Sequence, residues 1–182
     1  MRRSIALLAL ACAAAGLWAL PPLLHETPAR AQTVAAEVGD SGAEVARVRV
    51  EKAARRLVLL DESGRPLRVF TGIQLGPAPS GPKHFEGDGR TPEGHYTIDH
   101  GNPASAYHLS LHISYPDAAD RAYAAAAGRA PGGQIFLHGQ PNGFGPLRAP
   151  GDWTEGCIAL KNSEIEEIWQ RVGDGTPIDI VP

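Results

Sequence analysis

The alternation of hydrophobic and polar residues predicts a series of short β-strands. Within residues 45–51, valines alternate with charged residues, as in a strand that buries one face. Residues 56–61 predict a second strand and residues 66–75 a returning one, with the turn-forming sequence at 62–65 between them. Because short strands joined by tight turns pair most simply with their neighbours in the chain, we expect antiparallel β structure here.

The clearest alternation is SAYHLSLHISYP, residues 105–116. It predicts a strand with an apolar face formed by Tyr107, Leu109, Leu111, Ile113 and Tyr115. His108 and His112 share the opposite face, roughly 13 Å apart at the rise of a strand. That distance is too large for both to bind one metal from this strand alone, so we expect polar side chains lining a wet or active-site face.

Two segments predict helices. Residues 117–128 are rich in alanine and end at Gly128, which suits a helix C-terminus. A second helix is expected from Ser163 as N-cap, with an apolar stripe formed by Ile165, Ile168, Trp169 and Val172. With a final strand at residues 176–181, the pattern predicts a mainly β fold, sandwich or barrel-like, with two short helices.

The N-terminus predicts export. A positive tip at Arg2 and Arg3 precedes an apolar run, and a small-x-small site ends at Ala31, which together indicate a signal peptide over residues 1–31. The run through residues 5–24 is long, so an uncleaved membrane tether is the alternative. We expect residues 32–44 to be a linker and residues 45–182 to form one domain, located in the periplasm or cell envelope.

Composition narrows the function classes. Cleavage would remove Cys12 and leave Cys157 as the single cysteine of the mature chain, in a compartment that favours disulfides. Such an unpaired thiol is expected to be reactive or to pair with another chain. The net charge of −3 gives no support for binding nucleic acid. We expect a monomer that uses no metal or other cofactor.

Candidate chemistry concentrates in residues 134–172. Cys157 lies between Gly156 and Ile158, and His138 ends an apolar run and precedes Gly139. An imidazole that takes a thiol proton turns cysteine into a nucleophile at neutral pH. The loop between the two residues can bring them together in space. The alternative is a buried cysteine and a loop histidine that never meet.

His138-Gly139, a loop, and then TEGCIAL at residues 154–160 resemble the active-site signature of the L,D-transpeptidase (YkuD-like) family. A second landmark, GDGRTPEGHYTI at residues 87–98, occurs in the family's order. The resemblance implies Cys157 as nucleophile, His138 as base and Thr154 as the leading hydroxyl residue. Glu155 stands where a histidine is usual and Ala159 where an arginine often sits, which leaves the substrate contacts and the orienting group open.

The resemblance implies a β-sandwich that performs acyl transfer on peptidoglycan stem peptides. Gly139 would supply the carbonyl that orients the imidazole, and the backbone near Gly156 would supply oxyanion donors. Substrate contacts are expected from Trp153, Thr154, Glu155 and Ala159, although Trp153 is also interpreted as a hydrophobic plug.

Three alternatives remain at this stage. Water as the acceptor would make the protein an L,D-carboxypeptidase or amidase. Loss of catalysis would leave a peptidoglycan-binding module, a reading motivated by Glu155 and Ala159. A metal-dependent peptidase is disfavoured because the sequence shows no compact histidine and aspartate cluster with the spacing of metal ligands.

Overall fold

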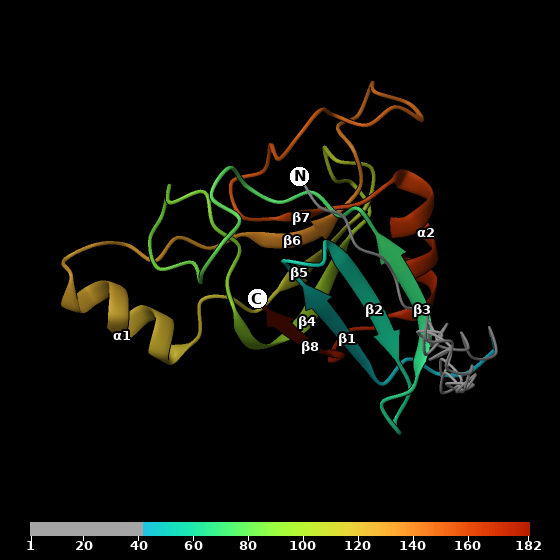
Figure 1. The fold of residues 1–182 in the computed structure, drawn as a ribbon, viewed down its shortest axis with the longest axis horizontal. Coiled ribbons are helices and arrows are strands. Elements are labelled where there is room, and N and C mark those ends of the chain that lie inside the picture. Colours follow the sequence, from blue (N-terminus) through green and yellow to red (C-terminus); the bar gives the residue numbers. More distant parts are fainter. Residues whose placement is uncertain (1–41) are drawn as a thin grey trace, which may run out of the picture. The chain divides into compact units, whose positions relative to one another are not determined.

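The computed structural model describes residues 42–182 (Figure 1). The elements are β1 (Arg47–Glu51), β2 (Arg56–Leu60), β3 (Pro66–Thr71), β4 (Gly94–Asn102), β5 (Ser110–Ile113), α1 (Ala118–Ala126), β6 (Ile135–His138), β7 (Ile158–Ala159), α2 (Asn162–Arg171) and β8 (Pro177–Val181). The segments predicted to be a signal peptide or tether, and most of the predicted linker, lie outside the described residues. Within the described part, none of the helices has the length and apolar character needed to span a bilayer.

The strands form one hydrogen-bonded series of eight, in the order β3-β2-β1-β8-β4-β5-β6-β7. Strands β1, β2 and β3 pair antiparallel as the sequence predicts. The last strand, β8, inserts between β1 and β4 and runs parallel to β1. The predicted mainly β fold with two helices is confirmed.

Strand β4 turns a corner between the two halves of this sheet. Its first part, from Gly94 to Thr97, pairs with β8, and its second part pairs with β5. At the corner the register shifts between Ile98 and His100, so Asp99 is the extra residue of a β-bulge. Strands that pass from one half of a sheet structure to the other commonly bend at such bulges.

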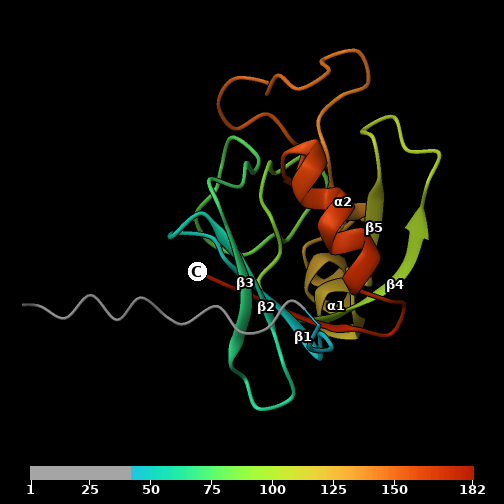
Figure 2. The same ribbon diagram turned by 90° about the vertical axis from the view of Figure 1, so that its right-hand side faces the viewer.

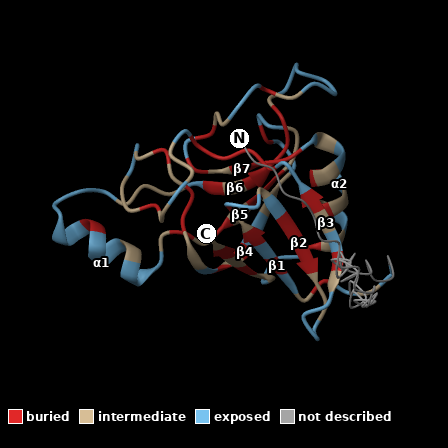
Figure 3. Cartoon of the chain, viewed as in Figure 1, coloured by how far each residue is buried: buried red, intermediate tan, exposed pale blue. Residues whose placement is uncertain are grey.

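The core lies between the inner sides of the strands and α2. Val48 and Val50 on β1 are fully buried while Arg47 and Arg49 are exposed, which confirms the alternation in the sequence (Figure 3). On α2, Ile165 and Ile168 are fully buried. The helix and the strands bury their apolar sides against each other, and each Å² of apolar surface buried stabilises the fold by about 25 cal/mol.

The long strand predicted at residues 105–116 is wrong in its first half. Strand β5 spans only Ser110–Ile113, and His108 has a positive φ of 69° that no strand accommodates. The Gly139 N–H donates to the carbonyls of both Tyr107 and Leu109, at 3.0 and 3.2 Å. The chain therefore turns here, and Tyr107 leaves the apolar face on which its spacing placed it.

Both predicted helices are present. Asp117 caps α1 by accepting from the Asp120 N–H at 2.8 Å. Helix α2 begins at Asn162, earlier than the expected N-cap at Ser163, with Lys161 as N-cap and Glu164 accepting from the Lys161 N–H. Figure 2 shows α2 lying across the sheet, where Trp169 covers Gly101 of β4 so closely that a Cβ there would lie 2.6 Å from the indole.

Candidate active site

His138 ends strand β6 and is held in one tautomer by the backbone carbonyl of the next residue, Gly139. The side chain is 3% exposed, and its Nδ1 lies 2.7 Å from the Gly139 carbonyl oxygen. Because a carbonyl only accepts, Nδ1 carries the proton and Nε2 keeps its lone pair. Burial lowers the pKa of His138, and the hydrogen bond to Gly139 only partly opposes this. The histidine is therefore neutral at pH 7 and able to accept a proton.

Two aromatic side chains pack against the His138 ring. Tyr107 lies 4.7 Å from it and Trp153 lies 5.5 Å from it, measured between ring centroids. Trp153 meets the imidazole edge to face, as expected of the plug interpretation. Its Nε1 is buried and has no hydrogen-bond partner in the described part of the chain. Tyr107 was not predictable as a site residue, because its spacing in the sequence matches one face of a strand and not a turn.

Cys157 lies immediately before β7, and its Sγ is 3.4 Å from the Gln134 carbonyl oxygen. Burial raises the pKa of the Cys157 thiol, while the Phe136 backbone and the Lys83 cation act in the opposite direction. Within residues 42–182, Sγ makes no hydrogen bond to His138. The resting pair is therefore a neutral thiol and a neutral imidazole.

Cys157 and His138 nevertheless line one cavity, of about 370 Å³. The other residues around it are Asn102, Ser105, Ala106, Tyr107, Ser110, Gln134 and Phe136. The sequence pattern did not predict that these segments from β4, β5, β6 and the loop before β7 would meet. Catalytic hydrogen bonds are often longer in a free enzyme than in its substrate complex, so a catalytic pair does not require this hydrogen bond in the resting state.

Thr154 shapes the turn that presents Cys157. Its hydroxyl donates to the Cys157 carbonyl at 2.7 Å and accepts from the Gly156 N–H at 3.3 Å. The side chain is buried, so its hydroxyl serves the backbone in this conformation. With the Gly156 N–H occupied, the Cys157 N–H is the better candidate for an oxyanion donor.

Gly156 is required by the backbone at this turn. It has φ of +125°, and a Cβ would lie 2.5 Å from the Arg90 carbonyl oxygen. We expect Gly156→Ala to lower the free energy of unfolding by about 1–3 kcal/mol from backbone strain alone. The clash with the Arg90 carbonyl adds to this cost. Urea unfolding measures the loss. Gly173→Ala is the matched control, since its Cβ would meet nothing within 4 Å, and an equal effect of both changes would contradict the prediction.

Glu155 and Ala159 lie away from the Cys157 cavity. Glu155 is exposed and lines a different cavity, of about 670 Å³, which also involves Lys83 and Gln134. Burial, and not the Glu155 carboxylate, raises the pKa of Cys157. Ala159 is fully buried and exchanges two backbone hydrogen bonds with Gln74, each 2.9 Å long. This position argues against the substrate contact expected of Ala159.

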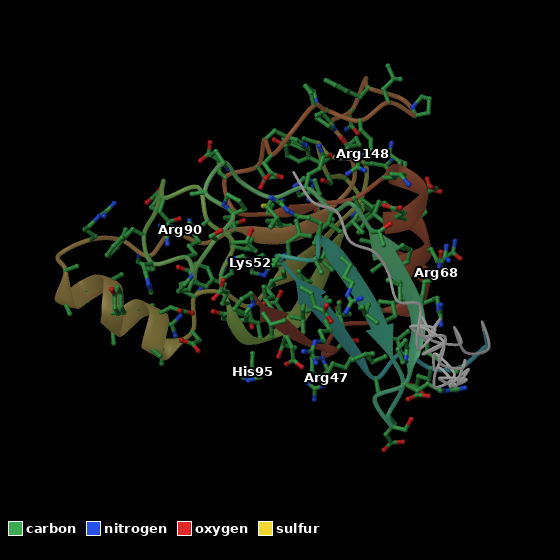
Figure 4. The ribbon with its side chains drawn as sticks, in the orientation of Figure 1. Arg47, Lys52, Arg68, Arg90, His95 and Arg148 are labelled. Atoms are coloured by element: carbon green, nitrogen blue, oxygen red, sulfur yellow. The ribbon has the colours of Figure 1, made fainter. Side chains whose placement is uncertain are left out.

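The loop between β6 and β7 is fixed at its base and exposed at its tip. Gln140 is buried and donates to the carbonyl of Leu160 at 2.7 Å. Asp152 forms an ion pair with Arg55 at 2.6 Å. Figure 4 shows Arg148 near the base of this loop, and Phe144 and Leu147 are exposed farther along it. Anchoring at both ends fixes the positions of His138 and Cys157 relative to each other.

Lys83 is a further functional candidate that sequence reasoning missed. Its Nζ lies 2.8 Å from the Asp88 carboxylate and is almost fully buried. The cation helps to lower the pKa of Cys157 against the effect of burial. The only signal in the sequence was its place just before the Gly-Asp landmark, where an ion pair with Asp88 was not predictable.

Comparison with known proteins agrees with this geometry. A family model described as the L,D-transpeptidase catalytic domain, YkuD, matches residues 46–180. "Putative L,D-transpeptidase YafK" of Escherichia coli (strain K12) is 32% identical over 94 residues, which are 50% of this chain and 32% of that protein.

Solved structures show the same fold. The helical cell shape determining protein Pgp2 of Campylobacter jejuni is 30% identical with a TM-score of 0.61, over 76% of this chain and 48% of that one. The L,D-transpeptidase of Xylanimonas cellulosilytica is 14% identical with a TM-score of 0.50, over 76% of this chain and 61% of that one. The chain spans about a third of the length of YafK and about half of the length of Pgp2. The match across residues 46–180, on a fold that brings a cysteine and a histidine to one cavity, places this chain in the L,D-transpeptidase catalytic domain (YkuD) family.

Proposed function

We propose that the chain catalyses cysteine-dependent acyl transfer on peptidoglycan stem peptides. The observation that carries the proposal is the shared cavity, lined by Cys157 and by a histidine whose protonated Nδ1 leaves Nε2 as a proton acceptor. Family membership supplies the substrate class. We further propose that the chain is exported to the periplasm, as its N-terminal sequence predicts, and that it contributes to cell shape, the role that Pgp2 has in its own name.

The reaction begins with proton transfer from Cys157 to Nε2 of His138 as Sγ attacks the substrate carbonyl carbon. The oxyanion of the tetrahedral intermediate accepts a hydrogen bond from the Cys157 N–H. Collapse breaks the L–D peptide bond, and the imidazolium returns its proton to the departing amine of the D-amino acid. The thioester that remains is resolved by the amine of a second stem or of an attached protein.

A neutral thiol and a neutral imidazole in the resting state suit this order of reaction steps. Because burial raises the pKa of Cys157 and lowers the pKa of His138, the thiol keeps its proton until a substrate carbonyl is in place. The proton then moves together with bond formation. An unpaired thiol in an oxidising compartment is protected from oxidation in the same way, since the thiolate is the reactive form.

Mass analysis of muropeptides after incubation with the purified chain tests the proposal. New linkages between stems indicate transpeptidation, whereas loss of a terminal D-amino acid without a new linkage indicates that water is the acceptor. Unchanged muropeptides, under conditions where the protein is folded, would favour a binding module without catalysis.

A carbapenem separates acylation from acceptor use. We expect the mass of the intact wild-type chain to increase by one carbapenem, because acylation requires only the Cys157 nucleophile and the His138 base. If Glu155 and Ala159 reflect a changed substrate, ordinary stem-to-stem cross-linking should be poor, since side chains around the thiol position the peptide and the acceptor and a small misplacement is costly. Efficient cross-linking would show that Glu155 and Ala159 are neutral departures, and absence of an adduct would contradict the acylation half.

A further inference from the structure

Three potential metal ligands converge beside the active-site cavity. Asp99 and His100 on β4 and His112 on β5 offer ligand atoms that all lie within 4.8 Å of one another. Nδ1 of His100 is 2.8 Å and Nδ1 of His112 is 2.7 Å from the same oxygen, Oδ1 of Asp99. The two rings stack with centroids 4.6 Å apart. His108, the residue that shares a predicted face with His112, instead pairs with Glu166.

The bulge in β4 creates this convergence. Ile98 pairs with Ile113 and His100 pairs with His112, so Asp99 between them has no pairing partner on β5. In a regular strand Ile98 and His100 would face the same side, and His100 would point into the core. The extra residue instead turns His100 toward His112 and brings the Asp99 carboxylate to the same side. Such a cluster cannot be seen in the sequence, where Asp99 and His100 are adjacent and His112 is twelve positions farther along the chain.

The cluster lies on the same face of β5 and β6 as His138. On β5 and β6, His112 opposes Phe136 and Ser110 opposes His138, so the histidine pair lies one step along the strands from the catalytic histidine. Phe136 packs against both rings, at 4.8 Å from His112 and 6.3 Å from His100. The same Phe136 lines the Cys157 cavity. The cluster is thus beside the cavity and separated from it by one aromatic ring.

We propose that Asp99, His100 and His112 bind a divalent first-row transition-metal ion of the Zn²⁺ class. Two imidazoles and one carboxylate are a ligand set that such borderline ions prefer. Ligand atoms around a zinc ion bonded at about 2.0–2.2 Å stand roughly 3–3.5 Å apart, within the span of this cluster. In the metal-free form the two N–H protons bridge to one oxygen, and a metal ion would take their place.

The state of the carboxylate favours the same assignment. The Asp99 carboxylate accepts hydrogen bonds from both imidazoles, so an oxygen ligand already faces both ring nitrogens. The side chains of Asp99 and His100 are 42% and 56% exposed, which leaves an entry path and open coordination positions. Those positions would accept water or a ligand carboxylate. The metal site does not depend on the proposed acyl transfer.

Isothermal titration with Zn²⁺, on the untagged chain carrying Cys157→Ala to remove the thiol as a ligand, tests the proposal. We expect one saturable site. Asp99→Asn and His100→Gln are each expected to weaken binding by roughly tenfold or more, because loss of a ligand costs at least as much as loss of a residue that supports one. His95→Gln is the matched control, since it removes a histidine that contacts an aspartate, Asp179, at 2.7 Å but belongs to no three-ligand cluster.

Figure 4 shows His95 pointing outward, and its side chain is 87% exposed, so the control change perturbs no packing. Absence of saturable binding, or less than a tenfold change in either cluster variant, would overturn the proposal. A second test needs no substitution in the cluster. Zn²⁺ should protect His100 and His112, but not His95, from a histidine-acylating reagent, read by peptide mass, and equal labelling with and without Zn²⁺ would also overturn it.

Discussion

Cys157→Ala is expected to abolish both the carbapenem adduct and turnover on stem peptides, with the fold unchanged. The thiol supplies the nucleophile, and a methyl group in its place cannot form a thioester. The side chain is small and only partly buried, and its hydrogen bond to the Gln134 carbonyl is 3.4 Å long. Intact mass measures the adduct, and urea unfolding measures the fold. An adduct on the variant would place the nucleophile elsewhere.

Cys157→Ser separates chemistry from packing. Serine preserves the size and a weak donor toward Gln134 but replaces the thiol by a hydroxyl, which His138 deprotonates far less readily. We therefore expect Ser and Ala variants to be equally inactive and both to unfold at nearly the wild-type urea concentration. Marked destabilisation of both would instead support the interpretation of Cys157 as a structural buried cysteine.

His138→Gln is expected to reduce turnover at pH 7 by roughly 10²-fold or more, the usual contribution of a general base, with a much smaller effect on substrate binding. Glutamine can keep a donor near the Gly139 carbonyl and fill space beside Tyr107, so the change chiefly removes the base. Since burial raises the pKa of Cys157, few molecules hold a thiolate without help. Steady-state kinetics on a stem peptide separate the effects on kcat and KM.

The pH dependence identifies the cause of that loss. Raising the pH increases the thiolate fraction of Cys157 in either protein, so alkylation of the His138→Gln variant should recover toward the wild-type rate above pH 9. His95→Gln, on the exposed surface, should behave as wild type at every pH. Equal alkylation rates of wild type and His138→Gln at pH 7 would show that His138 does not activate the thiol.

The local elements were largely predictable from the sequence. The alternation at β1, the turn before β3 and the alanine-rich α1 depend on interactions between near neighbours, and their positions are as expected. The same local reasoning failed at residues 105–109. There the N–H of Gly139, which is distant in the chain, donates to the carbonyls of Tyr107 and Leu109 and holds the segment in a turn. A period-2 pattern cannot report such a contact.

For the candidate site, the sequence by itself determined the residue types and the tautomer-fixing neighbour of His138. A cysteine beside a glycine, and a histidine followed by Gly139, are local features that chemistry can interpret directly. That Cys157 and His138 meet in space was a hypothesis based on the loop between them, and the resemblance supplied only their roles. Spacing along a chain with a long loop does not fix the distance between two residues.

Tertiary structure alone decided which neighbours act on these residues. Tyr107, Gln134 and Lys83 reach the site through strand pairing and loop anchoring, and burial sets the pKa directions of Cys157 and His138. The bulge at Asp99 likewise depends on how β4 passes from β8 to β5. Register, burial and side-chain direction arise from contacts between distant segments, and those contacts exist only once the sheet has formed.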